Sequence, residues 1–350
     1  MLSFCILIII CSVGMVNCSS STAGVDNTVV HQQTMTIIPD NDVDNNTEDE
    51  SLLQFTPFIL RLHLIRHGET IANVQNIVLG QGDSPLTDNG LILAQMASES
   101  PSINGRMIND DDSDRSSHYY YWRTYCSDLH RAHRTARIVL CLEDIHGTEI
   151  EQLASDDNNG DNSNRRSINL IVEPRLRELA KGAREGYPKS LSYEEAVARR
   201  IQEADDDGSS IDNVEIPLLE SIDDAWERAK DWIDSLVNDA SIEYNLIDES
   251  CDDANSSDGT KEKVYNVFGL SHSALMRTMI HKMVGSQLPE NYSLTKEGSL
   301  RIPNLSRTII DVRPYKVEGS RDDALRWKCR LLQLTDVSHL SDEPKGPPYL

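Results

Sequence analysis

Basic residues are scarce in this chain. Its 350 residues include 33 Lys and Arg against 57 Asp and Glu, which gives a formal net charge of −24 at pH 7. So much negative charge repels phosphate backbones and anionic lipid headgroups. The composition therefore argues against nucleic acid and against a membrane surface as general partners. The hydrophobic content of 39% is enough for one large core.

Recognisable metal-binding patterns are also missing. Outside the first 18 residues the chain has four cysteines and no CxxC pair, which argues against a zinc site and leaves room for one or two disulfides of unknown pairing. No acidic run has the Asp-x-Asp-x-Asp-Gly spacing of a calcium loop. Because these runs carry little apolar surface, we expect them to be solvated loops or disordered insertions. They cover residues 39–50, 109–114, 155–164, 203–213 and 248–260.

Only one long stretch, from Leu2 to Val16, is predominantly apolar and free of charged residues. It is too short for an ordinary membrane-spanning helix but has the length of a secretory signal. We therefore expect residues 1–18 to be a signal peptide and residues 19–57 to be a disordered polar leader. The expected location is the secretory pathway or the extracellular space, with no stable membrane span in the mature chain. A cytoplasmic location is the alternative, because Lys and Arg are absent from the start of the stretch.

The rest of the chain alternates between strand and helix patterns. Helical patterns begin after Thr87 and after Ser192, which forms a capping box with Glu195, and cover 129–145, 222–237 and 273–284. The alternation predicts an α/β domain over residues 58–337, a three-layer α/β/α sandwich with a mostly parallel central sheet. Residues 338–350 are expected to be a flexible tail. The expected strands are 60–66, 119–127, 168–173, 264–271, 307–313 and 326–335.

Chemically active side chains follow four of the expected strands. Arg66 and His67 come at the end of the first strand, and Arg131 follows the second. Glu178 follows the third strand, and His272 comes directly after the fourth. Each residue by itself has an ordinary explanation, such as a solvated helix face or an ion-pair partner. Because ligands of open α/β sheets bind beyond the carboxyl ends of the strands, the five together predict an anion site.

Five motifs in a fixed order carry a family resemblance. Over roughly residues 58 to 335 the chain resembles the histidine phosphatase superfamily, in particular its phosphatase branch, with the phosphoglycerate mutase-like fold. The segment GQGDSPLTDNG (80–90) also resembles the stretch that follows RHGE in this family. The motifs are RHGET (66–70), SDLHRAHRTA (127–136), LRELAKG (176–182), GLSHS (269–273) and PNLS (303–306).

The resemblance implies roles for seven residues. His67 would attack the phosphorus atom and form a phosphohistidine, while Glu178 donates a proton to the leaving group. Flanking arginines should lower the pKa of His67 and keep it neutral. The other five would bind the phosphoryl group: Arg66, Arg131 and His272 through their side chains, Asn73 by a phosphate or substrate contact, and Ser273 through its backbone N–H. The reaction would need neither metal nor cofactor, because arginine and histidine supply the positive charge.

Several alternatives stay open at this stage. A mutase of this family carries an ERHYG-like stretch, whereas this chain has ELAKG from Glu178, which favours phosphomonoester hydrolysis over phosphotransfer. A catalytically silent relative that binds a phosphorylated ligand is a further alternative. The substrate could be a small phosphorylated molecule or a phosphoprotein, and the sequence predicts neither its identity nor the oligomeric state. His133 and Arg134 are expected to be solvated, and Trp226 and Trp232 to pack in the core.

Overall fold

A computed structural model describes seven segments of the chain. They are residues 52–105, 121–150, 168–207, 216–250, 262–288, 300–318 and 325–340. All of them belong to one compact unit, Asp40–Leu350. The predicted signal peptide and most of the acidic runs lie outside these segments. None of the helices in the described segments is both long and apolar enough to span a membrane.

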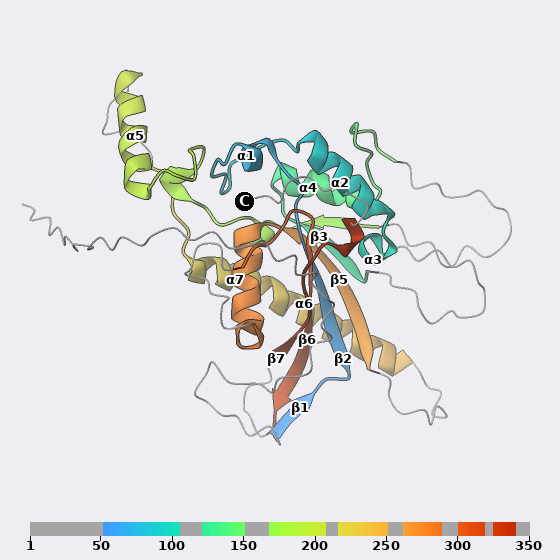
Figure 1. Ribbon diagram of the computed structural model, residues 1–350. Coiled ribbons are helices and arrows are strands. Elements are labelled where there is room, and N and C mark those ends of the chain that lie inside the picture. Colours follow the sequence, from blue (N-terminus) through green and yellow to red (C-terminus); the bar gives the residue numbers. More distant parts are fainter. Residues whose placement is uncertain are drawn as a thin grey trace, which may run out of the picture. The chain divides into compact units, whose positions relative to one another are not determined.

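Seven strands form one sheet in the order β1-β6-β2-β5-β3-β4, with β7 also paired to β6 (Figure 1). Strands β2, β5, β3 and β4 are parallel, as the sequence predicted. Strand β6 runs antiparallel to β1, β2 and β7, so one side of the sheet is antiparallel. The strands are β1 (Leu53–Phe55), β2 (Phe58–Arg66), β3 (Arg123–Cys126), β4 (Leu170–Val172), β5 (Lys263–Ser271), β6 (Arg307–Val317) and β7 (Arg326–Asp336).

Helices follow the strands much as the hydrophobic patterns indicate. Thr87 caps α2, and Ser192 and Glu195 form the predicted capping box at the start of α5. The α-helices are α1 (Ile71–Val74), α2 (Asp88–Glu99), α3 (Pro101–Asn104), α4 (His130–Val139), α5 (Tyr193–Asp206), α6 (Ile222–Ser250) and α7 (Ser273–Val284). Short 3-10 turns are η3 (Pro174–Leu176), η4 (Gly182–Arg184), η6 (Gly285–Gln287) and η7 (Ser338–Leu340).

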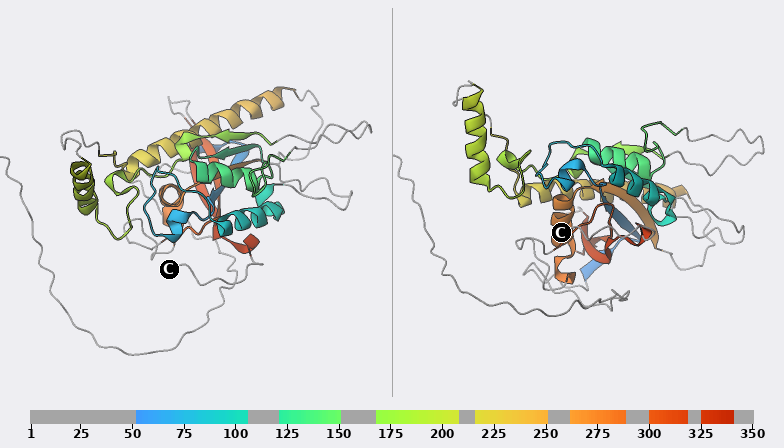
Figure 2. Two further views of the ribbon diagram at one scale, coloured as in Figure 1. Left: turned by 90° about the horizontal axis from the view of Figure 1, so that it is seen from above. Right: turned by 45° about the horizontal axis from the view of Figure 1, so that its top comes forward.

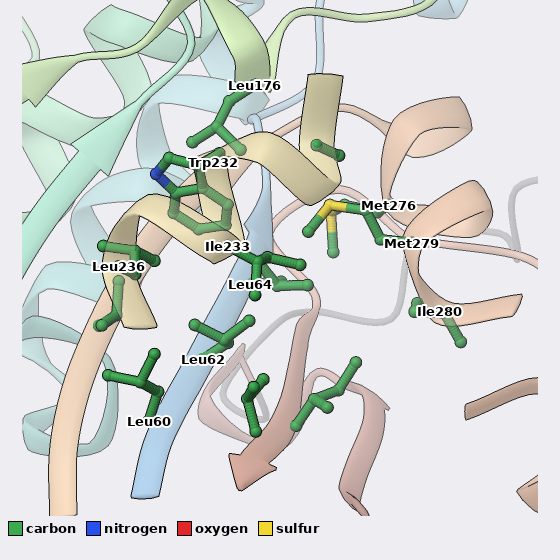
Figure 3. Packing of buried hydrophobic residues seen from close by; sticks show 14 of the residues in the cluster. Leu60, Leu62, Leu64, Leu176, Trp232, Ile233, Leu236, Met276, Met279 and Ile280 are labelled. Atoms are coloured by element: carbon green, nitrogen blue, oxygen red, sulfur yellow. The ribbon is translucent and has the colours of Figure 1, made fainter. Parts of the chain in front are cut away.

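Two hydrophobic clusters lie on opposite faces of the sheet. On one face, side chains of β2 pack against α6 and α7, and Figure 3 shows Trp232, Ile233 and Leu236 beside Leu60, Leu62 and Leu64. On the other face, Ile65 and Phe268 pack against residues of α2 and α4. Helices therefore cover both faces of the sheet, which confirms the predicted three-layer arrangement (Figure 2). Trp232 lies in the core as expected, while Trp226 is half-buried against Trp327.

Three boundaries differ from the sequence-based expectations. Leu53–Phe55 lie within the predicted leader yet form β1, because their backbone pairs with β6 some 260 residues later in the chain. Leu340 lies in the predicted tail but is buried in η7. The acidic run that starts at Glu203 begins inside α5, which continues to Asp206. In the first two cases a distant partner supplies the order that the local composition does not.

Candidate functional site

The carboxyl ends of the parallel strands bring the predicted residues into one region. Arg66 of β2 lies opposite Ser271 of β5, and Cys126 of β3 lies opposite Leu270. The His67 N–H donates to the Ser271 carbonyl at 3.0 Å. The segments that leave β2, β5 and β3 therefore start side by side, as expected for a ligand site of an open α/β sheet.

His67 is 3% exposed and has a defined tautomer. Its Nδ1 lies 2.6 Å from the Gly68 carbonyl oxygen, which can only accept, so Nδ1 carries the hydrogen of the neutral ring. Burial lowers the pKa of His67 well below its ordinary value, and the charges of Arg66 and Arg131 lower it further. Near neutral pH the ring is therefore uncharged and the lone pair is on Nε2.

His272 lies next to His67, with ring centroids 5.0 Å apart. It is fully buried at the N-cap of α7, and neither ring nitrogen has a hydrogen-bond partner among the described residues. Burial lowers its pKa well below 6.5, and the charges of Arg131 and Arg66 lower it further. His272 is therefore a neutral donor or acceptor. Its two unpartnered ring nitrogens are available to hydrogen-bond to a polar ligand.

The two predicted arginines are held differently. Arg66 donates through NH1 to the Ile302 carbonyl at 2.7 Å, and burial lowers its pKa to about 10, so it stays charged near neutral pH. Arg131 is 1% exposed and donates to the carbonyls of Gly80 (2.8 Å) and Gly82 (2.6 Å). The Nε atoms of both arginines are buried and have no hydrogen-bond partner within the described segments. Both guanidinium groups thus keep donors for a ligand.

Glu178 lies in the loop after η3, and its carboxyl group contacts backbone N–H groups at the start of α7. The sequence did not predict this contact. Within the described segments, Oε1 accepts the N–H groups of Leu179 (3.0 Å) and Leu275 (3.1 Å), whereas Oε2 accepts that of Ala274 alone (3.1 Å). The carboxyl is 8% exposed. Because a carboxylate oxygen has two lone pairs, Oε2 is the atom with room to exchange a proton with a ligand.

The two remaining predicted residues differ in whether they are available to a ligand: these are Ser273 and Asn73. Ser273 is the first residue of α7, and its N–H has no acceptor among the described residues, so it is available to an anion. Asn73 instead forms a capping box with Thr70 at the start of α1: its Oδ1 accepts the Thr70 N–H at 3.2 Å. The described contacts of Asn73 are local, and none joins it to His67 or Arg131.

Other residues support the site without having been predicted to do so. The Gly68 N–H donates to Thr135 Oγ1 at 3.1 Å, and Asn304 Nδ2 donates to the His67 carbonyl at 2.8 Å. Thr135 is four residues after Arg131 and shares its helix face, so the spacing in the sequence could have indicated that Thr135 lies at the site. Asn304 is in the PNLS motif, but its distance in sequence from His67 hid the contact. Arg134 donates to the Ile145 carbonyl at 2.9 Å and has no described contact with the site.

The loop after His67 packs tightly on α2, and Gly90 is the point of closest approach. A Cβ atom at Gly90 would lie 2.3 Å from the Glu69 carbonyl oxygen. We expect Gly90→Ala to lower the free energy of unfolding by about 1–3 kcal/mol, because the backbones must separate. Denaturant titration checks this, with Gly285→Ala as the control, since no atom lies within 4 Å of its added methyl. Equal stability of the two variants would contradict the packing argument.

Buried histidines make stability depend on pH. The pKa of His63 is lowered from 6.5 to about 4, mainly by burial. The unfolded chain binds a proton at this residue below about pH 6.5 while the folded chain does not, so the free energy of unfolding falls as pH falls. The effect of one histidine is up to about 1.4 kcal/mol per pH unit. We expect His63→Gln to reduce the slope between pH 6.5 and 4.5 in urea titrations. An unchanged slope would refute this assignment.

No group of three or more His, Cys, Asp or Glu side chains is placed to hold a metal ion within the described segments. Cys126, Cys141 and Cys329 are free thiols, and Cys251 lies outside these segments. The contacts described above therefore define the site through arginine, histidine, one carboxyl group and backbone N–H groups. This combination suits a tetrahedral oxyanion.

Comparisons with known proteins place this site in a family context. Residues 62–154 match the family model of the histidine phosphatase superfamily (branch 1). The chain is 25% identical over 232 residues to fructose-2,6-bisphosphatase TIGAR B of Danio rerio, covering 64% of this chain and 74% of that protein. It is 28% identical over 180 residues to the probable phosphoglycerate mutase GpmB of Yersinia pestis (strain Pestoides F), covering 51% of this chain and 64% of that protein. It thus spans slightly less than two thirds of the mutase.

Solved structures with similar folds have low sequence identity. A putative alpha-ribazole-5'-P phosphatase from Escherichia coli is 20% identical, with a TM-score of 0.44, and covers 79% of this chain and 96% of that one. A mycobacterial glucosyl-3-phosphoglycerate phosphatase is 19% identical, with a TM-score of 0.42, and covers 79% and 98%. The family model and the curated relatives confirm the resemblance that the ordered motifs predicted: residues 62–154 match the histidine phosphatase superfamily, and the similar proteins include a phosphatase and a probable phosphoglycerate mutase.

Proposed function

We propose that this protein hydrolyses a phosphomonoester through a phosphohistidine intermediate on His67. The observation that carries the proposal is the state of the His67 ring. It is neutral, its Nδ1–H is committed to the Gly68 carbonyl, and its Nε2 has no hydrogen-bond partner among the described residues. Two cationic guanidinium groups and a second imidazole lie around it. A neutral nucleophile among positive charges suits attack on a negatively charged phosphoryl group.

In the first step the phosphoryl group is bound by charge-assisted hydrogen bonds. Arg66, Arg131, His272 and the Ser273 N–H would donate to its oxygens and stabilise the charge of the transition state. Nε2 of His67 attacks phosphorus, the bond from phosphorus to the ester oxygen breaks, and the leaving oxygen takes a proton from Glu178 Oε2. The products are the alcohol, phosphohistidine and the Glu178 carboxylate.

In the second step the same carboxylate acts as a base. Glu178 removes a proton from water as the water oxygen bonds to phosphorus. The bond from phosphorus to His67 Nε2 breaks, and its electron pair returns to the ring. Inorganic phosphate leaves, and Glu178 is protonated again for the next cycle. The cationic side chains supply the positive charge, so the proposed reaction is independent of metal ions.

Turnover of p-nitrophenyl phosphate between pH 4 and 8 tests the proposal. We expect release of inorganic phosphate without any acceptor alcohol, at equal rates with and without EDTA. Loss of activity in EDTA that added metal restores would contradict metal independence. Nitrophenol release that requires an acceptor sugar acid, with the phosphoryl group recovered on that acceptor instead of as inorganic phosphate, would favour a mutase, in line with the name of the Yersinia pestis relative. Absence of turnover throughout this pH range would favour a silent phospho-ligand-binding protein.

We also propose that residues 1–18 direct export of the chain, on the basis of the apolar run from Leu2 to Val16. A fusion of residues 1–30 to a reporter protein tests this. Secretion and cleavage of the fusion are expected. Retention of the uncleaved reporter in the cytoplasm would favour the alternative location.

A further inference from the structure

An ion pair between Arg228 of α6 and Glu220, which lies just before that helix, contacts the segment that carries Glu178. Arg228 Nε and NH2 lie 2.6 and 3.1 Å from the two carboxylate oxygens of Glu220, which is a two-point contact. Both side chains are largely buried, at 19% and 14% exposure. The pair is anchored because Ala225, Ala229 and Trp232 of the same helix are fully buried in the core.

The same two residues form hydrogen bonds with the backbone on both sides of Glu178. Arg228 NH1 donates to the Arg175 carbonyl at 2.6 Å, and Arg228 NH2 reaches the Glu178 carbonyl at 3.4 Å. Glu220 Oε2 accepts the Ala180 N–H at 3.1 Å, and the Glu220 N–H donates to the Ala180 carbonyl at 3.1 Å. Three residues that surround or include Glu178 are thus fixed to one ion pair.

This anchoring matters because the segment has little regular structure of its own. Between the short turns η3 and η4, residues 177–180 belong to no helix or strand, and Lys181 forms a single β-bridge with Leu219. The carboxyl of Glu178 nevertheless has to accept the N–H groups of Ala274 and Leu275 and, in the proposed reaction, exchange a proton through Oε2. A displacement of about 1 Å at such a position can lower a rate about 100-fold.

We propose that Arg228 and Glu220 form a positioning pair, which acts through Glu178 by fixing the backbone of residues 175–180 and so sets the geometry of proton transfer to the leaving group. The inference rests on the proposed function, because it concerns the acid of that reaction. An ion pair that only stabilised the fold would change the amount of folded protein. A positioning pair affects the rate of one chemical step and leaves the rates of the other steps unchanged.

Two substrates with different leaving groups separate these two roles. Nitrophenolate leaves p-nitrophenyl phosphate readily without a proton, whereas the phenolate of phenyl phosphate depends more on an acid. The ratio kcat/KM reports the steps up to phosphoenzyme formation, so it isolates the acid role of Glu178. We expect Arg228→Gln to lower kcat/KM for phenyl phosphate about 10- to 100-fold and for p-nitrophenyl phosphate less than about threefold. Glu178→Gln should show the same selective pattern.

Further variants complete the experiment. Arg228→Lys should retain more phenyl phosphate activity than Arg228→Gln. A lysine can pair with Glu220, but it cannot make the two-point contact with Glu220 and also donate to the Arg175 and Glu178 carbonyls. The double variant Arg228→Gln/Glu220→Gln should be no slower than the slower single variant, since the two act as one unit. Lys230→Gln is the control, because it removes an exposed ion pair with Asp234 from the same helix and should leave both substrates unaffected.

Equal losses for both substrates, or no loss for either, in folded Arg228→Gln would overturn the inference. If Arg228→Gln does not fold, Glu220→Gln and Arg228→Lys are judged by the same substrate comparison. Phosphohistidine trapping in the wild type separates this test from the proposed function. A wild type that is phosphorylated, with variants that treat both substrates alike, refutes only the positioning pair. A wild type that forms no phosphohistidine refutes the proposed function and this inference with it.

Discussion

His67→Ala is expected to lower kcat/KM for p-nitrophenyl phosphate by a factor of about 10³ or more, because it deletes the nucleophile of the proposed reaction. The remaining groups, among them Arg66, Arg131 and His272, can still bind phosphate but cannot accept the phosphoryl group. Quenching a reaction with labelled substrate measures this directly. The wild type should retain an acid-labile, base-stable label, and the variant should retain none.

Two further variants make the result specific to the imidazole. His67→Asn keeps an amide donor that can reach the Gly68 carbonyl, so it tests whether the loss reflects the missing Nε2 rather than a collapsed loop. His133→Ala removes a half-buried histidine of α4 that has no described contact with the site, and it should retain the wild-type label. Label that persists after removal of His67 would identify a different nucleophile and end the proposal.

Replacement of Arg131 should have the next largest effect. We expect Arg131→Met to lower kcat/KM about 10²- to 10³-fold, the range found when a preorganised donor to a developing oxyanion is lost. It should also weaken competitive inhibition by inorganic phosphate, since a fully buried positive charge is removed. Arg131→Lys keeps the positive charge but lacks the forked donors of the guanidinium group. Its kcat/KM should lie between those of the wild type and Arg131→Met.

Arg131 also supports the loop that follows α1, and this contribution has to be measured separately. Its guanidinium donates to the Gly80 and Gly82 carbonyls, so Arg131→Met removes two donors from that loop. Denaturant titration gives the change in stability, while inhibition by phosphate reports on the site. Arg134→Met, one turn along the same helix, is the control and should leave kcat/KM near the wild-type value. An unchanged phosphate affinity in Arg131→Met would remove Arg131 from the site.

The charge of the site is opposite to that of the chain. The whole sequence has a net charge of −24, yet the charges that act on His67 are those of two arginines. The acidic residues gather in runs, and most of these lie outside the described segments. Net charge therefore argues against nucleic acid and anionic membrane surfaces as partners, while the order of the motifs predicts a phosphorylated ligand.

Local sequence determined the elements and the candidate residues of this protein. Alternating strand and helix patterns predicted six of the seven strands, and the Ser192 capping box marked the start of α5. The positions of His67, Arg131 and His272 just after strands were enough to predict a shared site, because parallel strands end at one edge of a sheet. These features depend on residues close together in the chain, and periodicity reports on such residues.

Only the tertiary structure decided the features that depend on distant backbone groups. It paired β1 with β6 and held the Glu178 carboxyl group against backbone N–H groups at the start of α7. It also joined Arg228 and Glu220 to the segment of Glu178. Each of these contacts satisfies a hydrogen-bonding group whose partner is fixed by packing rather than by spacing, and a sequence pattern does not contain that information.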